Sequence, residues 1–220
     1  MKHSLFTRLF LLCLILPLAG LSFRTVQAQD EADVPFSEFI KQLKTDGIIP
    51  NTDGTITSYG SYEKNIAKFG YWEGIPLLEA DHFVISAKFK MNASTKSTDV
   101  MNAGCGFFFD TLSGGSQYMM VSARMDGNAY LQGYRNYTKL SYGNYLYGSA
   151  STDQEGSMTL VFNGSRATFY INGRNILSRG DLPVIGNSVG LSILSGTNYD
   201  FGTGCSFDEI NVYTWEDPAE

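Results

Sequence analysis

The sequence predicts an all-β protein, an antiparallel β-sandwich preceded by one short helix. Its clearest element is a hairpin at residues 156–174. Met158, Leu160 and Phe162 recur there at every second position, as on the buried face of a strand. The Asn-Gly pair at 163–164 favours the positive φ angles of a tight turn. Because a lone hairpin cannot bury its apolar face, this one must belong to a larger sheet.

Further strands are predicted along most of the chain after residue 55. Residues 83–91 alternate apolar and polar side chains, and residues 104–110 (GCGFFFD) form an aromatic strand flanked by glycine. The full set of predicted strands is 56–59, 83–91, 104–110, 117–125, 128–135, 158–162, 167–171, 189–194 and 206–215, with 137–147 either a strand or a Tyr-rich loop. Residues 70–74 around Trp72 have the composition of a loop, in which a tryptophan most often covers the core. Many short strands at this spacing predict a sandwich or a barrel.

The predicted helix lies ahead of these strands. Phe36, Ile40 and Leu43 fall on one helical face, and Gly47 suits the end of the helix. We expect this helix to pack on the sandwich. The alternative is a mobile leader, because terminal segments often fray.

The first residues resemble an export signal. Lys2 and Arg8 precede an apolar run at 9–18, and the small-residue pattern at 26–28 suits cleavage. The run is short for a membrane span, although an uncleaved anchor is the alternative. The predicted organisation is therefore a signal peptide at 1–28, an N-terminal helix and leader at 29–55, and a β-sandwich domain at 56–220. The mature chain is expected to be secreted, either extracellular or at the cell surface, with no membrane insertion after cleavage.

The charge of the chain narrows the classes of partner. Residues 1–28 hold three basic and no acidic residues, so their removal takes the formal net charge from −6 to −9. An acidic chain without a Lys/Arg cluster argues against nucleic acid and against anionic lipid surfaces. Neutral glycans, cations and other proteins remain as partners, and the sequence does not indicate an oligomeric state.

Two cysteines remain after the predicted cleavage. Cys105 and Cys205 both adjoin glycine at the start of a predicted strand, where two backbones can approach closely. In an exported chain such a pair predicts one disulfide. The alternative is two buried free thiols.

From residue 83 onward, the order of strand motifs resembles the concanavalin A-like lectin/glucanase superfamily. The resemblance rests on FVISAKFKM (83–91), GCGFFFD (104–110), SMTLVFNGSRATFYING (157–173), VGLSIL (189–194) and SFDEINVY (206–213). The laminin G-like and 3-keto-disaccharide hydrolase-like branches look most similar. The resemblance implies a concanavalin A-like jelly roll, a fold that carries lectins, glycosidases and adhesion modules alike.

No catalytic residue is predicted. The E-x-D-x-x-E run of the family 16 glycosidases in that superfamily is absent, and the adjacent Asp208 and Glu209 point to opposite faces of a strand. Glycoside cleavage needs two carboxylates a few ångströms apart, and no spacing here singles out a pair. No nucleophile motif or phosphate-binding loop occurs either.

No cofactor is expected, apart from a structural Ca²⁺ that the resemblance implies near the last strand. Asp208 is the candidate ligand, with Asp110 as its partner, because Ca²⁺ prefers carboxylate and carbonyl oxygens. Phe207 and Ile210 differ in parity, which predicts a bulge between them. A hydrogen-bonding aspartate beside this bulge is the alternative.

A cluster of tyrosines is the strongest indication of function. In residues 128–135, Ala129 and Leu131 share one parity, while Tyr130, Gln132 and Tyr134 share the other. If the aliphatic face is core, the two rings face outward about 13–14 Å apart, where sugars could stack on them. The predicted ligand-binding residues are Tyr130, Gln132, Tyr134, Arg135 and Tyr137. The alternative is that these tyrosines are half-buried strand formers.

These observations favour a secreted, non-catalytic binding module for carbohydrate that uses the Tyr-rich sheet face. The expected partner is a glycan or a cell-surface polymer. Two alternatives stay open. One is a glycoside-cleaving enzyme of the 3-keto-disaccharide hydrolase type, and the other is a surface domain that binds proteins.

Overall fold

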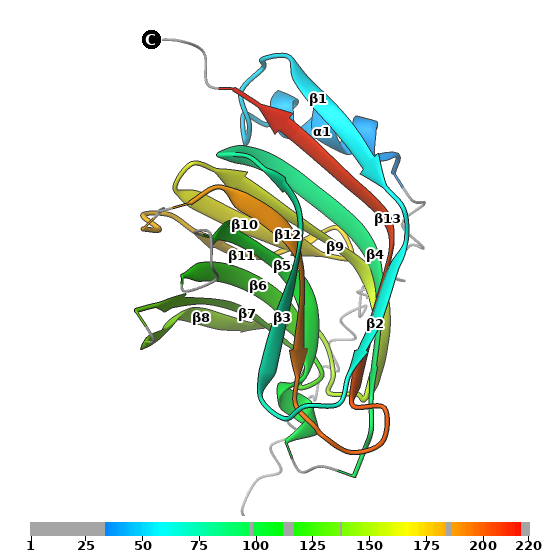
Figure 1. Ribbon diagram of the computed structural model, residues 1–220. Helices are drawn as coiled ribbons and strands as arrows, with labels where there is room; N and C mark the ends of the chain where they lie inside the picture. Colours follow the sequence, from blue (N-terminus) through cyan, green and yellow to red (C-terminus); the bar gives the residue numbers. More distant parts are fainter. Residues whose placement is uncertain (1–33, 97–98, 112–116, 137, 184–185, 217–220) are drawn as a thin grey trace, which may run out of the picture. The chain divides into compact units, whose positions relative to one another are not determined.

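The computed structural model describes residues 34–96, 99–111, 117–136, 138–183 and 186–216, without the side chains of Asp110 and Thr111. Over these ranges the chain forms a two-sheet antiparallel sandwich with one short N-terminal helix (Figure 1). The predicted fold class is confirmed. The predicted signal peptide at 1–28 and Tyr137 lie outside the described residues.

One sheet has seven strands and contains the hairpin that the sequence marks most clearly. Its order is β1-β13-β4-β9-β10-β11, and β2 also pairs with β13. The strands are β1 (Gly54–Tyr59), β2 (Tyr62–Ile66), β4 (His82–Ala93), β9 (Asp153–Asn163), β10 (Arg166–Ile171), β11 (Arg174–Arg179) and β13 (Thr203–Trp215). Gly164 has a φ of +63° in the turn between β9 and β10, as the Asn-Gly pair predicts.

The other sheet has six strands in the order β3-β12-β5-β6-β7-β8. They are β3 (Tyr71–Glu79), β12 (Ser188–Ser195), β5 (Gly104–Thr111), β6 (Tyr118–Arg124), β7 (Asn128–Arg135) and β8 (Thr138–Leu146). A 3-10 turn, η1 (Val100–Asn102), precedes β5. The prediction of a loop around Trp72 is wrong, because residues 71–74 belong to strand β3, which pairs with β12. Glycines in this segment hide the alternation of apolar and polar residues that marks a strand. Of the segment predicted as a strand or a Tyr-rich loop, Thr138–Leu146 form strand β8.

The core lies between the two sheets and is rich in phenylalanine. Rings from opposite sheets meet there, Phe83 with Phe109 and Phe107 with Phe169, each at 6.4 Å between centroids. Cys105 of β5 and Cys205 of β13 form a disulfide that joins the sheets, with 6.0 Å between their Cα atoms. The predicted disulfide is therefore present, and both cysteines are buried.

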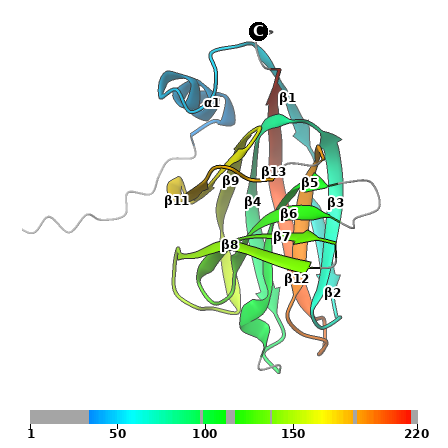
Figure 2. The same cartoon turned by 90° about the vertical axis from the view of Figure 1, so that its left-hand side faces the viewer.

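Helix α1 (Phe36–Thr45) packs on the outer face of the seven-stranded sheet (Figure 2). It buries Ile40 and Leu43, which follow the apolar pattern read from the sequence. The side chains packed with them are Val84, Val161, Tyr170, Tyr213 and Trp215. In the described part of the chain, no helix has the length and apolarity needed to cross a membrane.

The helix contact makes a testable contribution to stability. We expect Ile40→Val to lower the free energy of unfolding by about 1 kcal/mol, because Ile40 is 4% exposed and the change deletes a packed methylene. Chemical denaturation measures the difference. Ile48→Val is the matched control, since Ile48 is 37% exposed and the change there should stay within about 0.5 kcal/mol. Equal values for the two variants would contradict the described packing of α1.

Candidate functional site

The outer face of the six-stranded sheet carries a group of aromatic and polar side chains. In β6, Met119, Val121 and Ala123 pack into the core. Because neighbouring residues of a strand point to opposite faces, the other parity lies on the outer face. These outer residues of β6 are Tyr118, Met120, Ser122 and Arg124.

Two of them, Tyr118 and Arg124, line a cavity of ≈ 360 Å³. Strand β3, the ends of β6, β7 and β12, and the turn η1 all contribute to it. The described lining residues are Phe69, Gly70, Trp72, Asp99, Asn102, Tyr118, Arg124, Gln132, Gly133, Tyr134, Lys139, Leu194, Ser195 and Gly196. The cavity therefore combines residues that are up to about 130 positions apart in the chain.

Glycines let the Trp72 ring lie across the sheet. A Cβ atom at Gly74 would lie 2.8 Å from the Trp72 ring and 3.0 Å from the Phe108 ring. A Cβ atom at Gly190 would lie 2.6 Å from the same Phe108 ring. Because Gly74 and Gly190 have no side chain, the rings of Trp72 and Phe108 can occupy this space.

Three aromatic rings form a stacked series along one side of the cavity. Trp72 and Tyr118 are parallel with 4.0 Å between ring centroids, and Tyr134 stacks on Tyr118 at 5.7 Å. Burial raises the pKa of Tyr118, and the nearby Tyr134 adds to the effect, so Tyr118 stays neutral at physiological pH. The series presents an apolar wall with phenolic groups.

Arg124 is the central polar residue of the site. Its side chain is only 4% exposed. Nη2 donates a hydrogen bond to Oε1 of Gln132 at 2.6 Å, and the guanidinium carbon lies 3.9 Å from the ring centroid of Tyr130. The Tyr130 hydroxyl donates to Oδ2 of Asp126 at 2.6 Å, and this bond raises the pKa of Tyr130. The guanidinium is therefore held between an amide and an aromatic face.

Four buried polar atoms on this face have no hydrogen-bond partner among the described residues. They are Nε1 of Trp72, Oγ of Ser122, Nε of Arg124 and Oγ of Ser192. Both serines lie opposite Gly106 in the strand register, one on each side. Leaving a buried donor or acceptor unpaired costs about 1–3 kcal/mol, so native structures contain few such atoms. Of these four residues, Trp72 and Arg124 also line the cavity.

The structure separates the predicted ligand-binding residues. Gln132 and Tyr134 line the cavity. Tyr130 lies against Arg124 and is not among the described lining residues. Arg135 is exposed but lies outside the lining as well, and Tyr137 is not described.

The structure corrects the prediction that the rings of Tyr130 and Tyr134 are exposed. The parity is as expected, since Ala129 and Leu131 are core. However, Tyr130 and Tyr134 are only half-buried rather than exposed, and each has one ring face covered, by Arg124 and by Tyr118 respectively.

Sequence reasoning missed Trp72 and Arg124. Arg124 shares its parity with Tyr118 in a clean alternating strand, so its outward direction could be predicted from the sequence. Trp72 offered no comparable pattern, because its place depends on the pairing of β3 with β12, where Trp72 lies opposite Leu194.

The predicted calcium ligands are not brought together as a site. Asp208 is exposed on the seven-stranded sheet beside a bulge that shifts the register between Asp208 and Asn211, as the parity change predicts. Asp110 belongs to the other sheet, and its side chain is not described. Across the described ranges, no three or more His, Cys, Asp or Glu residues are grouped as metal ligands.

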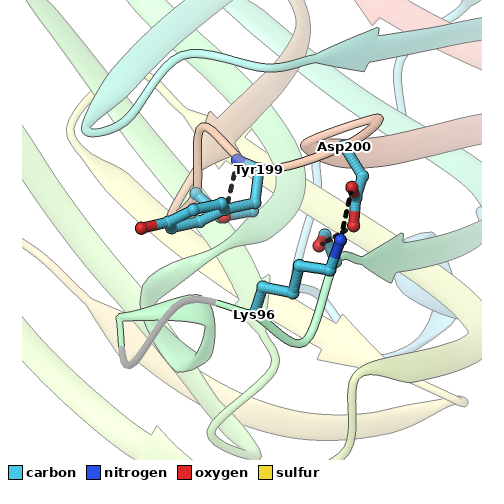
Figure 3. A network of polar contacts seen from close by, with 5 residues as sticks. Lys96, Tyr199 and Asp200 are labelled. Atoms are coloured by element: carbon cyan, nitrogen blue, oxygen red, sulfur yellow. Dashed lines mark hydrogen bonds and ion pairs between the residues drawn. The ribbon is translucent and has the colours of Figure 1, made fainter.

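A loop beside the cavity carries exposed aromatic residues. Tyr199 and Phe201 are 50% and 45% exposed, and they flank Asp200, which has a φ of +50°. Asp200 accepts hydrogen bonds from Nζ of Lys96 and Oγ of Ser94, both at 2.9 Å (Figure 3). These bonds lower the pKa of Asp200 and hold the loop against the end of β4.

The order and pairing of the strands define a concanavalin A-like lectin/glucanase fold, which confirms the resemblance found in the sequence. No family model matches the chain. No curated protein matches it either.

Several solved structures are similar to this chain. The carbohydrate binding module CBM66 from Bacillus subtilis matches with a TM-score of 0.53 and 11% identity, over 71% of this chain and 94% of that one. The crystal structure described as A. japonicus CB05 matches with a TM-score of 0.50 and 14% identity, over 74% of this chain but only 26% of that one. Sheep galectin-11 matches with a TM-score of 0.44 and 8% identity, over 66% and 98%. The first of these matches, with a TM-score of 0.53 at 11% identity, supports the fold alone.

Proposed function

We propose that this protein is a carbohydrate-binding module whose ligand occupies the cavity on the outer face of the six-stranded sheet. The observation that carries the proposal is that Nε1 of Trp72 and Nε of Arg124, beside the stacked aromatic wall, have no hydrogen-bond partner among the described residues. A sugar offers apolar C–H faces and many hydroxyl groups, which match an aromatic wall with free donors and acceptors. The similarity to a carbohydrate binding module of the same fold supports the proposal.

Binding without cleavage fits the cavity better than glycoside hydrolysis. Hydrolysis uses two carboxylates that flank the scissile bond. Among the described lining residues, Asp99 is the one carboxylate. The described lining therefore offers a single acid, where this mechanism uses two.

A protein-binding function is the second candidate, and the exposed loop aromatics favour it. Tyr199 and Phe201 lie on one surface loop, and Phe69 at the edge of the cavity is 55% exposed. Exposed aromatic residues are enriched in protein interfaces. A glycan array on which the protein binds no glycan would favour this second function.

We also propose that the protein acts outside the cell as a secreted chain, with the domain boundaries at 28/29 and 55/56 that the sequence predicts. The export-signal pattern supports this, and so does the disulfide between Cys105 and Cys205, since such bonds persist in oxidising compartments.

The carbohydrate proposal is tested by removing the aromatic wall. We expect Trp72→Ala and Tyr134→Ala each to weaken binding to a glycan identified on an array by about 10- to 100-fold, because stacking and excluded water are lost. Isothermal titration calorimetry measures the affinity. Tyr145→Ala is the matched control, because Tyr145 is an exposed tyrosine of β8 outside the lining. The proposal fails if all three variants bind like the unchanged protein.

A further inference from the structure

Arg124 is a buried cation without a neutralising carboxylate beside it. In the described part of the protein, no Asp or Glu side chain lies within ion-pair distance of its guanidinium group. Asp126 attracts it from further away. The oxygens of Asp126 are already engaged, since they accept hydrogen bonds from the Tyr130 hydroxyl and the Asn128 backbone N–H.

This arrangement is costly in the unbound protein. Burial lowers the pKa of Arg124, but a guanidinium group stays protonated at neutral pH. Buried charges in proteins are normally paired, because an unpaired charge loses its hydration without compensation. Here the partners are the Tyr130 ring and the Gln132 amide, and Nε has no partner among the described residues. These neutral contacts hold the guanidinium in place, and its charge has no ion-pair partner among the described residues.

We infer that the cavity recognises a sugar acid, and that the carboxylate of this sugar forms an ion pair with Arg124. The inference rests on the proposed carbohydrate-binding function and specifies its ligand class. A guanidinium group presents parallel N–H donors in a plane, which matches the two oxygens of a carboxylate. The bound carboxylate supplies the counter-charge that no described Asp or Glu side chain places within ion-pair distance of Arg124.

The remaining charges of the cavity fit one acidic sugar. Lys139 is a second cation in the lining, and Asp99 is the one carboxylate among the described lining residues. The formal net charge of −6 repels long polyanions at a distance. A cavity of ≈ 360 Å³ is at the small end of ligand pockets, which hold roughly 300–1,000 Å³. Recognition is therefore local, of one acidic sugar unit at a chain end or on a branch.

The test compares acidic glycans with their neutral counterparts. The full chain is applied to an array of uronic acid-containing oligosaccharides, each printed beside its carboxyl-reduced form, together with sulfated and unmodified neutral glycans. We expect binding to at least one acidic glycan and at least tenfold weaker binding to its reduced form. The affinity for the acidic form should fall as salt is raised.

Two variants test whether the preference for the acidic glycan arises in the cavity. Arg124→Gln should reduce affinity for the acidic glycan by at least about tenfold and abolish the preference over the reduced form. Lys139→Gln, on an exposed side chain, should reduce that affinity about two- to fivefold without affecting folding. Arg135→Gln is the control, because it removes the same charge from an exposed position of β7 outside the lining. A melting curve for each variant separates lost binding from lost folding.

The outcomes distinguish this inference from the proposed function. Equal binding to the acidic and the carboxyl-reduced forms, or binding to neutral or sulfated glycans alone, overturns the sugar-acid inference and leaves carbohydrate binding intact. Binding to no glycan overturns both. A preference for the acidic form that survives both Arg124→Gln and Lys139→Gln also overturns the assignment to this cavity.

Discussion

Replacing both Cys105 and Cys205 by alanine is expected to lower the free energy of unfolding by about 4–5 kcal/mol. The disulfide closes a loop with a sequence separation of 100 residues, and in the chain-entropy model such a loop restricts the unfolded chain by about that amount. Since a domain is usually stable by only about 5–15 kcal/mol, the variant should be close to unfolding at physiological temperature. Equilibrium denaturation in urea measures the loss.

The reduced form of the unchanged protein is the control for this prediction. Both cysteines are buried, so the alanine variant loses sulfur atoms from the core as well as the cross-link. The reduced protein keeps those atoms and loses only the covalent bond. We expect the reduced protein to show most of the loss in free energy of unfolding that the double alanine variant shows. A reduced protein as stable as the oxidised one would show that the covalent bond contributes little.

Gly190→Ala is expected to destabilise the protein by about 2–3 kcal/mol and to weaken ligand binding at the same time. A Cβ atom at Gly190 would lie 2.0 Å from the backbone oxygen of Ile75 and 2.6 Å from the Phe108 ring. Because a backbone atom cannot swing aside, β3 must move away from β12. Trp72 belongs to β3, so its stack on Tyr118 should be disturbed.

Gly60→Ala is the matched control for Gly190→Ala. Gly60 lies between β1 and β2, has no positive φ, and its added Cβ would meet no atom within 4 Å. We expect a change within about 0.5 kcal/mol there and unchanged affinity. Denaturation and calorimetry on both variants check the two effects. If Gly190→Ala behaves like Gly60→Ala, the close approach of β3 and β12 is not required for the site.

The strand pattern was predictable from local sequence because a buried face requires an apolar residue at every second position. The alternation of Met158, Leu160 and Phe162 and the Asn-Gly turn at 163–164 predicted β9 and β10 without any knowledge of their neighbours. The bulge near Asp208 followed from a change of parity in the same way. The pairing of Cys105 with Cys205 followed because only two cysteines remained after the predicted cleavage.

The binding face was only partly predictable from the sequence. The local pattern of a strand shows which side chains point outward, but it does not show which side chains of other strands contact them. The parity of Ala129 and Leu131 placed Gln132 and Tyr134 outside the core. It could not show that Arg124 from the preceding strand covers the ring of Tyr130. A period-2 pattern gives the direction of a side chain and carries no information about which strand lies beside it.

The sequence by itself therefore determined the sandwich, its main strands, the disulfide and the face that carries the polar residues. Only the tertiary structure decided that Trp72 reaches Tyr118 and that Arg124 is buried with no ion-pair partner among the described residues. The physical reason is that sheet order is set by contacts between distant segments. Strand β3 precedes β5 and β6 in the chain but pairs with β12, more than 100 residues later, and this pairing brings Trp72 to the cavity.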